Sequence, residues 1–184
     1  MKKTTLLKLS GLGALFLFVG SASAEDSYAE DRAQIENLQA RYMFALDFRD
    51  AEAYAETFTE DGVLDYGAGQ IVGRQAIRDL INRMRENQQQ RQAADTSDLR
   101  PSAGRHNISN FILKVDGNTA VGRAYWFHMG NNNPERAAQL NSFGHYEDEL
   151  VKVDGEWLFS KRLIMNEQVA DWAHKGPNPA RLSK

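Results

Sequence analysis

An aspartate and a histidine stand out among the residues that could do chemistry. Asp47 follows Met43 by one helical turn at the edge of an apolar stripe, and His106 stands in a segment with the alternation of a strand. A carboxylate at such a position is costly to bury unless it is paired. If it accepts a proton from one imidazole nitrogen, it fixes the tautomer and leaves the other nitrogen free as a base. We therefore predict an Asp47–His106 catalytic dyad; the structural alternative is a polar pair at a sheet edge, with Asp47 ending its helix.

Aromatic and polar side chains on the predicted strands could contact a substrate. Asn110 is expected on the same strand face as His106, because side chains alternate along a strand. A phenol such as that of Tyr66 or Tyr146 could polarise a carbonyl group, or it could pack in the core with its hydroxyl at the rim. We assign substrate contacts to Tyr42, Tyr66, Asn110, Trp126, His128 and Tyr146.

The first half of the chain is predicted to be mainly helical. Ile35, Leu38 and Tyr42 follow the helical period, which predicts an amphipathic helix over residues 27–48. Asp50 is placed to cap a second, short helix that carries Phe58 on its apolar side. The remaining elements expected here are short strands at 63–66 and 70–72 and a third helix that fades near Asn87.

The second half changes to the alternation that is typical of strands. The polar stretch 87–104 is predicted to end a helix and form a long surface loop, a kind of segment that often serves as a lid or binding loop. Antiparallel strands are expected at 105–115, 119–129, 142–153 and 156–165, with tight turns at Asp116-Gly117 and Asp154-Gly155. Helices followed by a strand meander predict an α+β fold, with three helices packed against one face of a curved antiparallel sheet.

The N-terminus has the features of a secretion signal. Lys2 and Lys3 precede an apolar run, and Ala22-Ser23-Ala24 supplies the small residues that a signal peptidase accepts. Residues 1–24 are therefore predicted to be a cleaved signal peptide and residues 25–184 a single domain, which is periplasmic or secreted. The apolar run is shorter than the roughly 20 residues that cross a bilayer, so no membrane association is expected after cleavage.

Composition and motifs exclude several function classes. The chain has no cysteine, so thiol catalysis and disulfides are excluded. Its 22 basic residues are outnumbered by 25 acidic ones and form no stripe with aromatics, which argues against a nucleic-acid partner. Nucleotide-binding glycine motifs, a nucleophile elbow and a zincin motif are missing, and the four histidines are widely spaced, so neither a metal nor a cofactor is predicted.

Several segments, in this order and spacing, resemble the SnoaL-like branch of the nuclear transport factor 2-like superfamily. They cover most of the chain between about residues 31 and 164 and comprise Tyr42 to Asp47, Gly62 to Tyr66, Gly73 to Ile77, Arg105-His106 with Asn110, and Asp154 to Trp157. The resemblance implies a cone-shaped sheet wrapped around the helices, an internal apolar cavity, and a homodimer or higher homo-oligomer.

Enzymes of this superfamily include scytalone dehydratase, polyketide cyclases, ketosteroid isomerase and a dehydrochlorinase, and they need no metal or organic cofactor. Asp47 and His106 are similar to the aspartate and histidine of the dehydratase and the dehydrochlorinase, and Tyr66 is similar to the carbonyl-polarising tyrosine of the dehydratase. His128 matches the second histidine of the dehydratase only when the alignment is shifted. Tyr146 departs from the dehydratase pattern, which leaves the substrate open.

We therefore expect a cofactor-independent lyase or isomerase that removes a proton from carbon. His106 is the expected base, Asp47 orients it, and Tyr66 or Tyr146 donates to the developing oxyanion; the substrate is expected to be small, apolar and cyclic. The alternative is an exported binding protein that holds a small hydrophobic ligand without converting it. A third possibility, a structural subunit similar to the small chain of ring-hydroxylating dioxygenases, is disfavoured by the predicted export.

Overall fold

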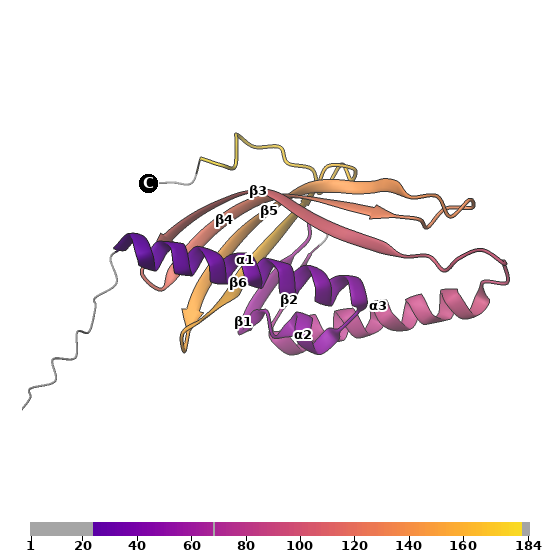
Figure 1. Cartoon of the computed structure of the whole chain (residues 1–184), viewed down its shortest axis with the longest axis horizontal. Coiled ribbons are helices and arrows are strands. Elements are labelled where there is room, and N and C mark those ends of the chain that lie inside the picture. Colours follow the sequence, from indigo (N-terminus) through magenta and orange to yellow (C-terminus); the bar gives the residue numbers. More distant parts are fainter. Residues whose placement is uncertain (1–23, 68, 182–184) are drawn as a thin grey trace, which may run out of the picture.

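The computed structural model describes residues 24–67 and 69–181, which form a curved sheet with helices on one side (Figure 1). The strands follow the order β2-β1-β6-β5-β4-β3. The helices are α1 (Ala24–Phe48), α2 (Ala51–Ala55) and α3 (Arg74–Ala94). The strands are β1 (Phe58–Asp65), β2 (Gln70–Val72), β3 (Gly104–Asp116), β4 (Thr119–Gly130), β5 (Gln139–Val153) and β6 (Glu156–Asn166). The predicted α+β architecture is confirmed.

The helices match the prediction except that α2 ends at Ala55, before Phe58, and that α3 is longer than expected. The predicted cap holds, because the Asp50 carboxylate accepts the backbone N–H of Ala53 at the start of α2. Helix α3 continues past Asn87 to Ala94. Glutamine, arginine and alanine are good helix formers, but this last part buries no apolar stripe, so hydrophobic periodicity missed it.

The sheet is a four-strand antiparallel meander, β3 to β6, extended by β1, which pairs in parallel with β6. The Asp154-Gly155 turn is confirmed, with both residues at positive φ, 51° and 87°. Strand β1 begins at Phe58, earlier than predicted, because Phe58 pairs with Phe159 before a register shift. Phe58 had been expected on the second helix instead.

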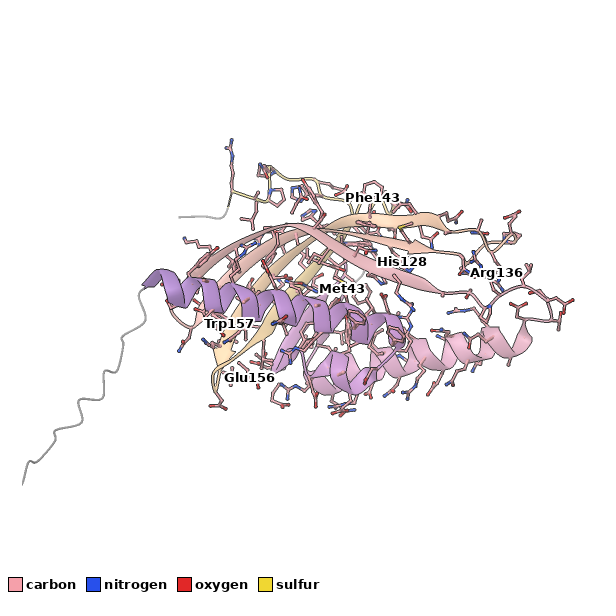
Figure 2. All side chains as sticks on the ribbon, viewed as in Figure 1. Met43, His128, Arg136, Phe143, Glu156 and Trp157 are labelled. Atoms are coloured by element: carbon pink, nitrogen blue, oxygen red, sulfur yellow. The ribbon has the colours of Figure 1, made fainter. Side chains whose placement is uncertain are left out.

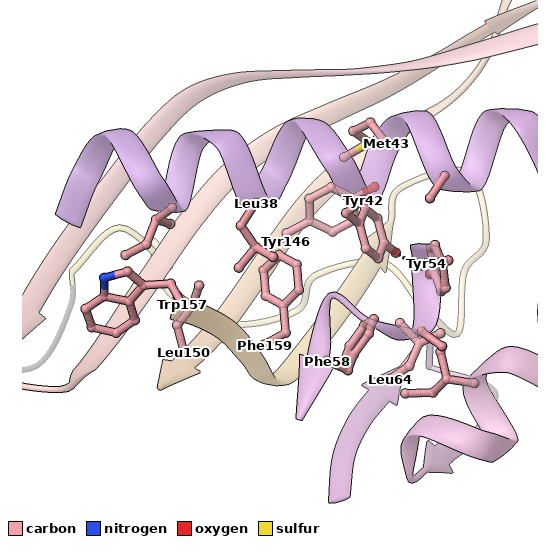
Figure 3. Packing of buried hydrophobic residues seen from close by; sticks show 14 of the residues in the cluster. Leu38, Tyr42, Met43, Tyr54, Phe58, Leu64, Tyr146, Leu150, Trp157 and Phe159 are labelled. Atoms are coloured by element: carbon pink, nitrogen blue, oxygen red, sulfur yellow. Dashed lines mark hydrogen bonds between the residues drawn. The ribbon is translucent and has the colours of Figure 1, made fainter. Parts of the chain in front are cut away.

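Aromatic side chains fill the space between α1 and the sheet (Figure 3), and three of them surround a buried guanidinium. Arg162 is fully buried, and its guanidinium lies 4.1 Å from the ring centroids of Tyr42, Tyr146 and Phe159. It donates two 2.8 Å hydrogen bonds to the buried carboxylate of Asp148. Although burial opposes its charge, Asp148 raises the pKa of Arg162.

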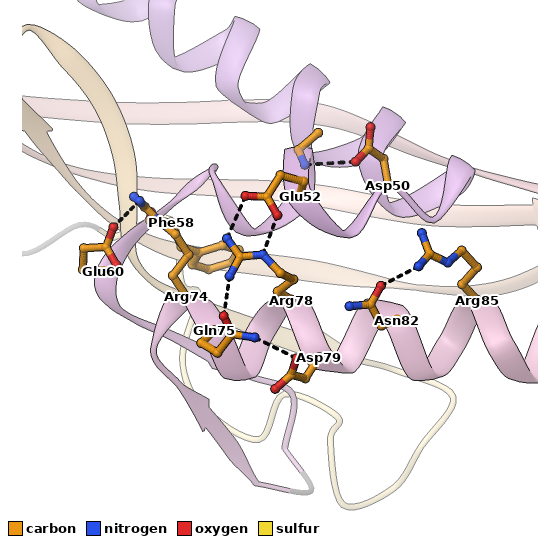
Figure 4. A network of polar contacts seen from close by, with 11 residues as sticks. Asp50, Glu52, Phe58, Glu60, Arg74, Gln75, Arg78, Asp79, Asn82 and Arg85 are labelled. Carbon is orange, nitrogen blue, oxygen red and sulfur yellow. Dashed lines mark hydrogen bonds and ion pairs between the residues drawn. The ribbon is translucent and has the colours of Figure 1, made fainter.

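Polar contacts at the surface join the second and third helices (Figure 4). Arg78 of α3 donates to both carboxylate oxygens of Glu52 of α2, at 2.6 and 2.8 Å. Arg74 donates to the backbone carbonyl of Phe58 at 3.0 and 2.6 Å, which ties the start of α3 to β1. These contacts set the orientation of α3, whose far end borders the pocket described below.

No helix in the described part of the chain combines the length and apolar character needed to cross a membrane. The predicted signal peptide lies outside the described residues apart from Ala24, the first residue of α1.

Candidate active site

The two residues of the predicted dyad are in direct contact. His106 Nδ1 lies 2.6 Å from Asp47 Oδ1, and the backbone N–H of His106 donates to both oxygens of the same carboxylate, at 3.2 and 3.0 Å. The Asp47 side chain is 6% exposed and the His106 side chain 19% exposed. The carboxylate therefore faces an Nδ1–H donor, and Nε2 of His106 is left as the basic nitrogen.

Chain geometry explains why these two residues meet. Asp47 lies in the last turn of α1, whose end is closed by the Asp50 N–H donating to the Ala45 carbonyl at 2.9 Å. His106 lies near the start of β3, the edge strand of the sheet. An edge strand has backbone N–H groups without a strand partner. The backbone N–H of His106 is such a group, and it donates to the Asp47 carboxylate at the end of α1.

A second histidine stands beside the dyad. His128 of β4 is the cross-strand partner of His106, and the two ring centroids are 4.4 Å apart. Burial, together with the nearby His106, lowers the pKa of His128, so its imidazole is neutral at pH 7. Asn141 Nδ2 lies 3.5 Å from His128 Nδ1, an approach that favours the tautomer with a proton on Nε2.

Gly104, at the start of β3, makes room for the His128 ring. A Cβ on Gly104 would lie 2.1 Å from His128 Nε2, far inside contact distance. Glycine is therefore required here for the imidazole to keep this position.

The two histidines and Asp47 border a pocket of about 690 Å³ between the end of α1, the second half of α3 and the loop before β3. Figure 2 shows Arg136 at its far end, opposite the end of α3; Arg136 pairs with Asp95 there. The loop predicted over 87–104 does border the pocket, through residues 95–103. The charged lining residues are Asp47, Arg49, Arg91, Asp95, Arg105 and Arg136.

This lining is more polar than the sequence resemblance implied. Four arginines and two aspartates face the space, whereas an apolar cavity was expected. The reason is that the aromatic residues expected to line the cavity are used to cover Arg162 in the core.

Three of the predicted substrate contacts lie in the core rather than at this pocket. Tyr42 and Tyr146 are buried against Arg162, and Tyr42 accepts a 2.7 Å hydrogen bond from Tyr54. Trp126 is buried between Tyr146 and the dyad, 6.2 Å from the His106 ring, and its Nε1–H donates to the Met165 carbonyl. The indole N–H of Trp126 is therefore already used in a hydrogen bond within the core.

Asn110 and Tyr66 also lie away from the pocket. The register of β3 shifts between Ser109 and Ile112, and Asn110 has a positive φ of 54°. This β-bulge turns the Asn110 side chain away from the face of His106, so the predicted strict alternation was wrong beyond Ser109. Tyr66 packs edge-on against Trp172, with ring centroids 5.6 Å apart.

The structure adds pocket residues that sequence reasoning missed. They come from the end of α3, the loop before β3 and the first residue of β3, the loop between β4 and β5, and the start of β5, and they include Arg91, Leu99, Gly104, Arg136 and Asn141. A polar loop of unusual length was the one available signal, and it indicated the segment but not the individual side chains. Asn141 belongs to the part of β5 that precedes its predicted start.

Solved structures share this fold. Rv3472 from Mycobacterium tuberculosis, a protein of unknown function, is 26% identical with a TM-score of 0.66, and the match covers 84% of this chain and 89% of that one. A nuclear transport factor 2-like protein with a cystatin-like fold from Novosphingobium aromaticivorans is 25% identical, with a TM-score of 0.59 over 78% of this chain and 89% of that one. A protein assigned as a scytalone dehydratase from N. aromaticivorans DSM 12444 is 23% identical, with a TM-score of 0.61 over 87% of this chain and 99% of that one, a likeness of fold.

The sequence also matches a family model. The model describes a SnoaL-like domain and aligns with residues 27–163, a span that contains nearly all of α1 and of the sheet and both histidines of the pocket. The predicted resemblance is thereby confirmed: the chain belongs to the SnoaL-like family.

Proposed function

We propose that the protein is a cofactor-independent lyase or isomerase of the dehydratase or cyclase type. The observation that carries the proposal is the 2.6 Å contact between Asp47 and His106 at the wall of a pocket. A ligand carrier gains nothing from a carboxylate that fixes the tautomer of a histidine, whereas a general base depends on it. The fold shared with a protein assigned as a scytalone dehydratase supports the same reaction class.

In the proposed reaction, Nε2 of His106 removes a proton from a carbon next to a carbonyl group. The electron pair of the broken C–H bond moves toward the carbonyl oxygen, and the imidazolium that forms is stabilised by Asp47. His128 is neutral and stands 4.4 Å from His106, so it is our candidate donor to the developing oxyanion, in place of Tyr66 or Tyr146. Elimination of a leaving group, reprotonation or ring closure could follow from this common step.

The lining of the pocket narrows the substrate class. A volume of about 690 Å³ suits a small cyclic molecule, and the arginines suit acidic or strongly polar substituents. We therefore propose a cyclic carbonyl compound that carries carboxylate or hydroxyl groups, instead of the purely apolar molecule expected from the sequence.

A deuterium-exchange screen tests this proposal without knowledge of the natural substrate. Cyclic ketones and hydroxyketones, with and without a carboxylate, are incubated with the protein in deuterated water, and exchange at carbon is followed by NMR. We expect exchange that is lost in His106→Gln and kept in the control Arg83→Gln, an exposed position on α3. Binding of these compounds without any exchange in the wild type would instead indicate a carrier.

Export and homodimer formation complete the proposal. Cleavage after Ala24 would leave α1 nearly whole, since the helix begins at that residue. The sequence of the exported protein, determined from its N-terminus, should begin at Glu25.

The proposed homodimer would form on the sheet face opposite α1, where Tyr125, Met129 and Phe143 are exposed apolar residues. Sedimentation should show a dimer that Phe143→Glu dissociates, and a wild-type monomer would contradict this part.

A further inference from the structure

Two histidines and a glutamate converge on the sheet face opposite the pocket, where the C-terminal segment crosses β5 (Figure 1). His145 and Glu147 lie two residues apart on β5 and share this face, while His174 comes from the segment after β6. His145 Nε2 lies 3.4 Å from Glu147 Oε1, and His174 Nδ1 lies 4.0 Å from the same oxygen. The candidate ligand atoms of the three side chains all lie within 4.8 Å of one another.

The atom of each side chain that faces away from this cluster already has a partner. His174 Nε2 lies 2.7 Å from the Pro177 carbonyl, which accepts its proton and leaves Nδ1 with a lone pair toward the cluster. His145 Nδ1 lies 3.9 Å from Glu167 Oε1, so a carboxylate stands behind this imidazole as well. Arg123 Nη2 lies 3.1 Å from Glu147 Oε2, which leaves Oε1 turned to the histidines. Outer partners of this kind fix the tautomers and orientations of metal ligands.

We propose that His145 Nε2, Glu147 Oε1 and His174 Nδ1 bind one divalent transition-metal ion, with Zn²⁺ as the best fit. In a tetrahedral zinc site with bonds of about 2.0–2.1 Å, ligand atoms lie roughly 3.3–3.5 Å apart. The 3.4 and 4.0 Å separations are close to this spacing, so small side-chain rotations close the site. Two imidazoles and one carboxylate suit zinc and its neighbours, whereas Ca²⁺ and Mg²⁺ prefer sites made of oxygen ligands.

The position of the site gives it a structural consequence. His145 is buried on the sheet, and His174 belongs to a segment that has no strand partner of its own. A shared ion would therefore fasten residues 167–181 to β5 and leave a fourth coordination position for water. This face lies away from Asp47 and His106, so the inference does not depend on the proposed reaction.

Zinc titration of tag-free protein tests the inference. With ¹⁵N-labelled histidine, NMR resolves the four imidazoles of the chain, and one equivalent of Zn²⁺ should shift His145 and His174 alone. Calorimetry should give one ion per chain, while Ca²⁺ at the same concentration should have no effect. Shifts at His106 and His128 instead, or no binding at all, would overturn the proposal.

Variants separate the site from the rest of the chain. His174→Ala should abolish zinc binding, and His106→Gln, which removes a histidine elsewhere, should leave it intact. Glu167→Gln alters only the outer partner of His145 and should weaken binding about 10- to 100-fold. Hydrogen exchange of residues 167–181 should slow on zinc addition in the wild type but not in His174→Ala; unchanged binding in that variant would refute the ligand set.

Discussion

Replacing Asp47 with asparagine should disable His106 while leaving the protein folded. The carboxylate accepts the backbone N–H of His106 as well as the contact from Nδ1. Asparagine has one carbonyl oxygen, which can still accept the backbone N–H. Its amide nitrogen then faces Nδ1 and can only donate to it. The imidazole must consequently carry its proton on Nε2, the nitrogen that has to act as the base.

The size of the effect follows from this tautomer change. Loss of a positioned general base costs about 10²- to 10⁴-fold in rate. Loss of a nearly buried hydrogen bond to a charged group costs about 1.5–3 kcal/mol of folding free energy. Most of that stability loss should be tolerated by a domain with typical stability, so the rate loss should greatly exceed any loss of folded protein.

Two measurements check the reasoning for Asp47→Asn. The ¹⁵N shifts of the His106 ring should show a proton on Nδ1 in the wild type and on Nε2 in the variant. Deuterium exchange of an active carbonyl compound should fall by the factor given above. The control Asp79→Asn changes a partly exposed carboxylate on α3 and should have neither effect. A wild-type His106 with its proton on Nε2, or a variant that keeps its activity, would refute the dyad.

Three further predictions concern the surroundings of the dyad and the core. Gly104→Ala places a Cβ 2.1 Å from His128 Nε2 and should displace the ring, with an activity loss of about 100-fold but a native circular-dichroism spectrum. Because folding lowers the pKa of His128, the unfolded chain binds a proton at this imidazole more readily than the folded chain does. The free energy of unfolding, measured by urea titration, should therefore fall as the pH drops below about 6.5. His128→Gln should flatten this part of the pH profile. Arg162→Met should lower the free energy of unfolding, measured in urea, by about 3–5 kcal/mol, because it leaves the Asp148 carboxylate buried without its cation. The double variant Arg162→Met/Asp148→Leu should recover part of this free energy. A loss below ~1 kcal/mol in Arg162→Met would contradict the role of this pair.

Sequence patterns predicted helices and strands well where the pattern depends on a single element. Helical spacing at Ile35, Leu38 and Tyr42 located α1, and all three residues are fully buried. Alternation and the turn at Asp154-Gly155 located the hairpins of the meander. Both signals depend on which side of one element meets the core, which short-range periodicity reports directly.

Signals failed where the partner of a residue lies far along the chain. The face that carries Asn110 was wrong because a β-bulge has no hydrophobic pattern of its own. Tyr42 and Tyr146 have aromatic side chains that suit a ligand pocket, but they cover Arg162, which lies 120 residues after Tyr42. Spacing in sequence holds no information on such contacts.

Residue types and their short-range spacing were enough to predict the order of the elements, the α+β class and the candidate pair of Asp47 and His106. The folded chain was needed to show that these two side chains meet, that His128 joins them, that arginines line the pocket, and that His145 and His174 converge on the opposite face. Each of these depends on strand register and on where the end of a helix or a loop crosses the sheet, which are set by the packing of the whole domain.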